Sequence, residues 1–155
     1  MTTEADYEAH EWQALNQAPL KAGLYVLTAD PNVTGMLGEM RALDGALRQP
    51  NVEPAAAELV AAIIATLAAK READDPSAAP TGAPRESIPA DLGDAMALVL
   101  ARGSEAEATA FGGWLLGIAA AVARASREGG FLGVGGTEVS QRERIALDEL
   151  QARLT

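Results

Sequence analysis

An uncharged run of sixteen residues, Ala108 to Ala123, constrains the fold of this chain more than any other feature of its sequence. The run contains three glycines and is shorter than the roughly 20 apolar residues that cross a bilayer as a helix. We therefore predict a buried core helix that follows Ser104 and reaches Glu128, and neither a membrane span nor a membrane partner. Its bulky residues recur every three or four positions, as on one face of a helix, namely Phe111, Trp114, Leu115, Ile118 and Val122.

Composition favours a single all-α domain. The 155 residues are 48% hydrophobic but only 4% aromatic, and alanine and leucine, which favour helices, supply most of the apolar volume. A chain of this length can bury a self-sufficient core. We expect residues 1–155 to form one compact bundle of six or seven helices.

The chain is strongly acidic, with a formal net charge of −10. That charge repels a phosphate backbone, and no cluster of Lys and Arg offsets it, so we expect no nucleic-acid partner. Cysteine is absent, which excludes disulfides, thiolate metal sites and a cysteine nucleophile. The first residues are acidic and polar, unlike a signal peptide, and we expect a cytoplasmic protein.

The remaining helices are predicted from apolar periodicity and from residues that start or stop helices. Residues 3–16 suit a short amphipathic helix on the surface, and Pro19 suits the first position of a separate helix that ends near Leu27. Further helices are expected from Pro31 to near Pro50, over residues 54–70 and 89–102, and after Ser140. Met40 and Leu100 are expected to face inward, as are some of Ile145, Leu147, Leu150 and Leu154.

Two helix starts have the S-x-x-E spacing of a capping box, Ser104 with Glu107 and Ser140 with Glu143. In such a box the serine and glutamate side chains each bind the backbone amide of the other residue. The helix before Ser104 is expected to end at Gly103, because glycine readily forms a helix C-terminal cap.

Residues 73–87 are predicted to be a Pro-rich linker or loop. Pro76, Pro80 and Pro84 recur every four residues, so neither a helix nor a strand can persist there. The chain on each side of this segment has the pattern of a short helix, a turn and a longer helix. Two helical hairpins packed pseudo-symmetrically would explain that likeness.

Two short stretches match ligand-binding loops in part, and each lacks an essential residue. Gly130 to Thr137 has the pattern of a phosphate-binding loop, except that Gly136 stands where lysine is required. The first half of a calcium loop is also present, but Arg41 stands where a bidentate glutamate is required. We predict a helix cap with a glycine-rich turn in the first stretch and a helix start in the second, whose matching residues are Asp30, Asn32, Thr34 and Gly35.

No catalytic, cofactor-binding or metal-binding residue can be assigned from the sequence. His10 is the only histidine, which excludes Ser-His-Asp and multi-histidine sites within one chain, and we expect it on a solvated helix face. Carboxylates alone could perform acid–base chemistry or hold a hard cation. Their spacing is that of ordinary solvated helix faces, so we expect no enzyme, no cofactor and no metal; the candidates considered are Glu39, Asp44, Asp94, Asp148 and Glu149.

Gly113, Gly117 and Ala121 form a row of small residues along the predicted core helix. In lipid such a row promotes dimerisation, whereas in a soluble protein it lets another helix of the same core approach closely. We expect the second, intramolecular use.

Phe131, Leu132 and Val134 lie between glycines and form the candidate interaction loop. Apolar side chains in such a turn either fold back onto the core or contact a membrane or a partner protein. We expect an inward plug, because full burial of each side chain contributes roughly 1.5–3 kcal/mol.

Most of the chain resembles a family of small bacterial all-α proteins without an assigned function. Two segments carry this resemblance, EWQALNQAPLKAGLYVLTADPNVTGMLGEM and WLLGIAAAVARASREGGFLGVGGTEVSQRERIALDEL. The portion GGTEVSQRERIALDEL is also similar to TerB-like tellurite-resistance proteins, where an acidic turn, a Val/Ile-Ser pair and a glutamate begin a helix. Val139, Ser140 and Glu143 match that pattern, and Gly135-Gly136 replace its Asp-Gly pair.

Together these observations predict a non-enzymatic binding or assembly module that associates with itself or with an unknown protein partner. We expect a homodimer that buries an apolar helix face, because nearly every predicted helix has an apolar stripe while few aromatic residues fill the interior. The TerB-like resemblance implies the alternative of an envelope-stress or metal-handling protein. An enzyme that uses only carboxylates is the third possibility.

Overall fold

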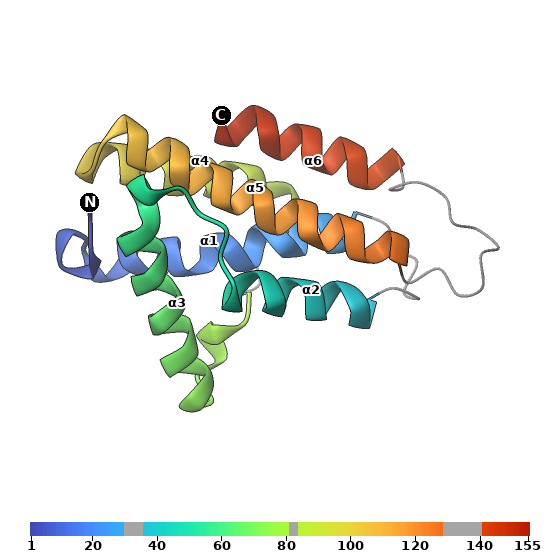
Figure 1. Ribbon diagram of the computed structural model, residues 1–155, viewed down its shortest axis with the longest axis horizontal. Helices are drawn as coiled ribbons and strands as arrows, with labels where there is room; N and C mark the ends of the chain where they lie inside the picture. The colour runs from blue at the N-terminus through green and yellow to red at the C-terminus, as the bar shows by residue number, and fades with distance from the viewer. Residues whose placement is uncertain (30–35, 81–83, 129–140) are drawn as a thin grey trace.

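The structure is a computed structural model that describes residues 1–29, 36–80, 84–128 and 141–155 (Figure 1). Within these ranges the chain is a compact all-α bundle without strands, as the sequence predicts. Six α-helices are present in the described residues: α1 (Ala9–Leu27), α2 (Met36–Arg48), α3 (Ala57–Glu72), α4 (Ile88–Arg102), α5 (Glu105–Glu128) and α6 (Gln141–Leu154). Short 3₁₀ turns cover Glu4–Asp6, Pro54–Ala56, Pro76–Ala78 and Arg85–Ser87.

The uncharged run forms the long core helix α5, which packs against α1, α2, α4 and α6. In Figure 1, α5 lies between α6 above it and α2 below it, while α3 points away from the bundle. Residues 105–125 are long and apolar enough to cross a membrane by length and composition alone, and 61% of their apolar window is buried inside the protein. Core helices share that composition. The bulky side chains that α5 buries include Phe111, Leu115, Ile118 and Val122.

The predicted break before Pro19 is wrong, because α1 continues through this proline. Proline in the interior of a helix costs about 3 kcal/mol, since it has no backbone N–H and crowds the preceding turn. Tertiary packing offsets that cost, with eleven of the nineteen residues of α1 buried. The start of α1 is amphipathic, as predicted: Trp12 and Leu15 belong to the core, whereas His10, Gln13 and Ala14 are exposed.

Met40 and Leu100, which were expected at the core, are exposed instead, and so is Ile145, one of four α6 residues of which only some were expected to face inward. Met40 is 55% exposed and Leu100 is 54% exposed, and Ile145 is 50% exposed on α6. Each lies on a helix that buries other residues of its apolar stripe, such as Leu47, Val99 and Leu150. The stripe on these helices is therefore wider than the surface that the rest of the bundle covers.

At the start of α5, Glu107 does not complete the predicted capping box. The backbone amide of Glu107 donates to Ser104 Oγ over 3.1 Å, so half of the box is formed. The carboxylate of Glu107 instead accepts hydrogen bonds from Thr2, near the start of the chain. Gly103 caps α4 as predicted, with its N–H donating to the carbonyl of Val99. Ser140 of the second predicted box lies outside the described residues.

The described parts of the Pro-rich segment contact α1. Gln17 of α1 donates to the carbonyl oxygens of Ser77 and Ala79, over 2.8 and 3.3 Å. Arg85 lies over the Tyr25 ring, 4.0 Å from its centroid. The helices on the two sides of the segment differ in order of length: α1 has 19 residues and α2 has 13, whereas α4 has 15 and α5 has 24.

Candidate functional site

The row of small residues on α5 faces solvent and not another helix. Gly113 and Gly117 are exposed, and a Cβ atom built on either would meet nothing within 4 Å. The expectation of a close intramolecular approach at this row is therefore wrong. The close approach occurs one residue earlier, at Gly112, where a Cβ atom would meet the carbonyl oxygen of Leu154 and, at 2.9 Å, Met96 Cε. One glycine of the adjacent pair is thus required for packing, and the other leaves an open helix face.

Two hollows extend along this open face. The larger has a volume of about 760 Å³ and lies between the first half of α5 and residues 51–55. The smaller, of about 330 Å³, lies between the second half of α5 and residues 46–51. Asn51 and Trp114 line both hollows, so the two form one groove. We call it the α5 groove; its α5 wall includes Ala106, Thr109, Gly113, Gly117, Ala120 and Ala121.

Trp114 borders the α5 groove at the point that both hollows share. The side chain is only 2% exposed, and its indole Nε1 has no hydrogen-bond partner. Contact with Phe111, at 5.9 Å between ring centroids, fixes the ring. A buried donor without an acceptor costs about 1–3 kcal/mol.

Charged residues lie only at the two ends of the α5 groove. Glu53 and Glu105 line the end near the N-terminus of α5, and Arg124 lines the opposite end. Thr109 and Asn51 supply hydrogen-bonding side chains between these ends. The groove therefore suits a partner surface that is uncharged in its middle and carries complementary charges at its ends.

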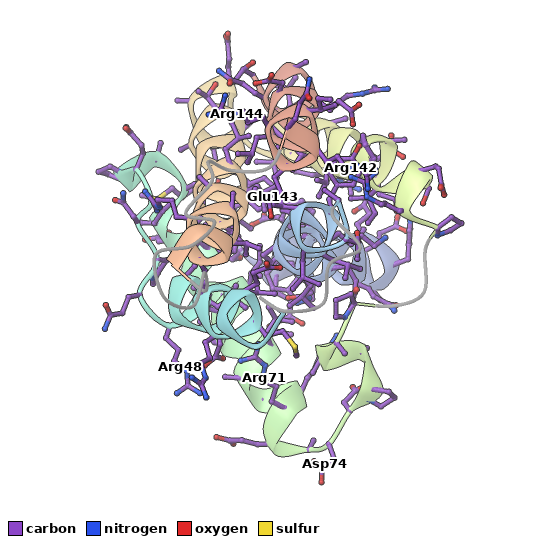
Figure 2. The ribbon with its side chains drawn as sticks, turned by 90° about the vertical axis from the view of Figure 1, so that its right-hand side faces the viewer. Arg48, Arg71, Asp74, Arg142, Glu143 and Arg144 are labelled. Carbon is purple, nitrogen blue, oxygen red and sulfur yellow. The ribbon has the colours of Figure 1, made fainter. Side chains whose placement is uncertain are left out.

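A separate hollow of about 270 Å³ lies between α2 and α3 and has an apolar floor that includes Leu47 and Leu67. At its rim, Arg48 and Arg71 both bind Asp44, over 2.7 and 2.8 Å (Figure 2). The hydrogen bond from Arg48, the larger of the two influences, and the bond from Arg71 lower the pKa of Asp44. These ion pairs join the two helices and leave one carboxylate shared by two guanidinium groups.

The candidate carboxylates do not converge on one site. Glu39 is buried in α2 and Asp94 is exposed on α4, whereas Asp148 and Glu149 are exposed on α6. The Tyr25 hydroxyl donates to Glu149, which joins α1 to α6. Within the described residues, no three His, Asp or Glu side chains are grouped as metal ligands would be. His10 is exposed, as predicted, and its Nδ1 lies 3.4 Å from Glu8.

Several candidate residues lie outside the described residues. They are the partial calcium loop from Asp30 to Gly35, the Gly130–Thr137 stretch, and the candidate interaction loop of Phe131, Leu132 and Val134. Of the residues that match the TerB-like pattern, only Glu143 is described. It is buried and lies toward the interior of the bundle, whereas Arg142 and Arg144 are exposed (Figure 2).

Sequence reasoning missed the contribution of residues 46–55 to the α5 groove. Asn51 lies in a polar connection between two helices, where nothing in the local pattern indicates a wall of a groove. The glycine row on α5 was the available signal, although it was interpreted as a contact within the core. Comparisons with protein-family models, with curated proteins and with solved structures found no match.

Proposed function

We propose that this protein is a non-enzymatic assembly module that forms a homodimer through the α5 groove. The single observation that carries the proposal is the exposed, uncharged face of α5, with Gly113 and Gly117 at its centre. Small residues allow two helix backbones to approach closely, which increases van der Waals contact between them. We therefore expect such a helix face to form more favourable van der Waals contacts with a partner helix than with water.

The groove also lacks the pairing of groups that nucleophilic catalysis requires. Its hydroxyl group belongs to Thr109 and its carboxylates to Glu53 and Glu105, while the single histidine, His10, lies on α1 outside the groove. A hydroxyl nucleophile needs a base such as histidine within hydrogen-bond reach. Binding, and not covalent chemistry, is accordingly the activity proposed for this surface.

The oligomeric state of a groove variant tests the proposal. We expect native mass spectrometry and light scattering at tens of micromolar to report a dimer of the unmodified protein. Gly113→Leu places a bulky side chain on the open face and is expected to give a folded monomer. The matched control is Gly93→Leu on α4, because a Cβ atom at Gly93 also meets nothing within 4 Å and Gly93 does not line the groove.

Both substitutions replace glycine in a helix and so improve helix propensity by a similar amount, up to about 1 kcal/mol. A difference between them in oligomeric state is therefore a property of the groove. A monomer of the unmodified protein would contradict the proposal, as would a Gly113→Leu variant that dimerises as well as the control.

A further inference from the structure

Resting on the proposed homodimer, we infer that α5 of one copy packs antiparallel against α5 of a second copy, with Gly113 of each copy facing Gly117 of the other. The argument begins with the order of residues along the open face. Reversing the helix about the midpoint between Gly113 and Gly117 places Ala106 opposite Arg124 and Thr109 opposite Ala121. Each of these residues lines the α5 groove.

Charge complementarity favours this orientation over a parallel one. Glu105 lies at one end of the groove and Arg124 at the other, and neither has an ion-pair partner within the described part of its own chain. Antiparallel packing brings Glu105 of each copy near Arg124 of the other, which gives two symmetric ion pairs. Parallel packing places like charges together at both ends. Helix dipoles also favour the antiparallel arrangement, because opposite helix ends then lie side by side.

The unpartnered indole of Trp114 is a second, independent observation at the same surface. Trp114 lines both hollows, one residue from Gly113, and its buried Nε1 donor has no hydrogen-bond partner in the described part of its own chain.

Because the chain has no cysteine, introduced cysteines report the register directly. Thr109→Cys combined with Ala121→Cys is expected to form an intermolecular disulfide under mild oxidation. The two positions lie about 18 Å apart along one helix, too far for a bond within one copy. Thr109→Cys alone is expected to remain unlinked, whereas it would link to itself in a parallel dimer.

Charge reversal provides a second test that does not depend on disulfide geometry. Arg124→Glu is expected to raise the dimer dissociation constant roughly tenfold, since two ion pairs become two repulsions. Glu105→Arg added to Arg124→Glu is expected to restore dimerisation. Circular dichroism checks that each variant is folded, and native mass spectrometry measures the dimer.

The outcomes separate this inference from the proposed function. A dimer in which Thr109→Cys links to itself, or in which the double charge reversal fails to restore binding, would overturn the antiparallel register and leave the homodimer standing. A strict monomer of the unmodified protein would overturn both. Selective linkage of the Thr109→Cys/Ala121→Cys variant supports the antiparallel register.

Discussion

Thr2 and Glu107 join the start of the chain to the start of α5. The backbone N–H of Thr2 donates to Glu107 Oε1 over 2.6 Å, and the Thr2 hydroxyl donates to the same oxygen over 2.9 Å. Both residues are buried, and the Thr2 hydroxyl also lies 2.8 Å from the hydroxyl of Tyr7. The other carboxylate oxygen of Glu107 has no partner.

Replacing Glu107 with alanine is expected to lower the free energy of unfolding by about 1–3 kcal/mol, because the two buried donors of Thr2 lose their acceptor. Glu107→Gln keeps a carbonyl oxygen at that position and is expected to retain most of the stability. Urea unfolding followed by circular dichroism measures both variants. An equal loss in the two would show that the negative charge, and not the acceptor, stabilises this contact.

The adjacent glycines of α5 are expected to respond to alanine in opposite directions. Gly112→Ala pushes a methyl group into the carbonyl of Leu154 and into Met96, and overpacking of this kind costs about 1–3 kcal/mol. Within one copy Gly113→Ala meets open space, and at a concentration low enough to keep the protein monomeric it is expected to stabilise the helix by about 0.5–1 kcal/mol. Thermal unfolding of the two variants at the same low concentration tests the pair, and a similar shift in both would contradict the packing described here.

The two tyrosines predict a loss of stability at alkaline pH. Burial is the main cause that raises the pKa of Tyr25 above 10.0, and the hydrogen bond to Glu149 adds to it. Burial likewise raises the pKa of Tyr7. A raised pKa in the folded state means that this stability is fully present below pH 10.0 and is lost as the pH rises through the folded-state values.

Ultraviolet titration measures this directly, because Tyr7 and Tyr25 are the only tyrosines in the chain. Both are expected to ionise above pH 10.0 in the folded protein and near it in urea. In Tyr25→Phe the loss of stability at alkaline pH is expected to be smaller, because only one of the two tyrosine hydroxyl groups with a raised pKa remains. Ionisation of either tyrosine below pH 10.0 in the folded protein would mean that its pKa is lowered and not raised, which would contradict the prediction.

Arg85 is expected to hold the Pro-rich segment against α1. Its guanidinium lies over the Tyr25 ring and donates to the Tyr25 carbonyl over 3.2 Å. Arg85→Ala removes both contacts and is expected to cost about 1–2 kcal/mol of unfolding free energy. Arg41→Ala, at an exposed position on α2, serves as the control and is expected to be nearly neutral. If the two variants unfold alike, the segment is not held by this residue.

The sequence predicted the all-α class, the long core helix and the glycine cap at Gly103, because periodicity and capping are local properties. Pro19 was misassigned because its local preference for a helix start is weaker than the packing of α1. Glu107 was misassigned because its acceptor role depends on Thr2, which is distant in sequence. Helical register alone places Gly113 opposite the apolar stripe of α5, but the close contacts that Leu154 and Met96 make at Gly112 depend on tertiary packing that the sequence does not show.

The position of α1 has a consequence for the order in which the fold is completed. Its apolar residues, among them Trp12, Leu15 and Leu20, are covered chiefly by α4 and α5, which begin only at Ile88 and Glu105. A ribosome synthesises α1 first, so this face stays uncovered on the nascent chain until α5 has emerged. Exposed apolar surface at that stage favours aggregation. Emergence of α5 therefore sets the earliest point during synthesis at which the core can close.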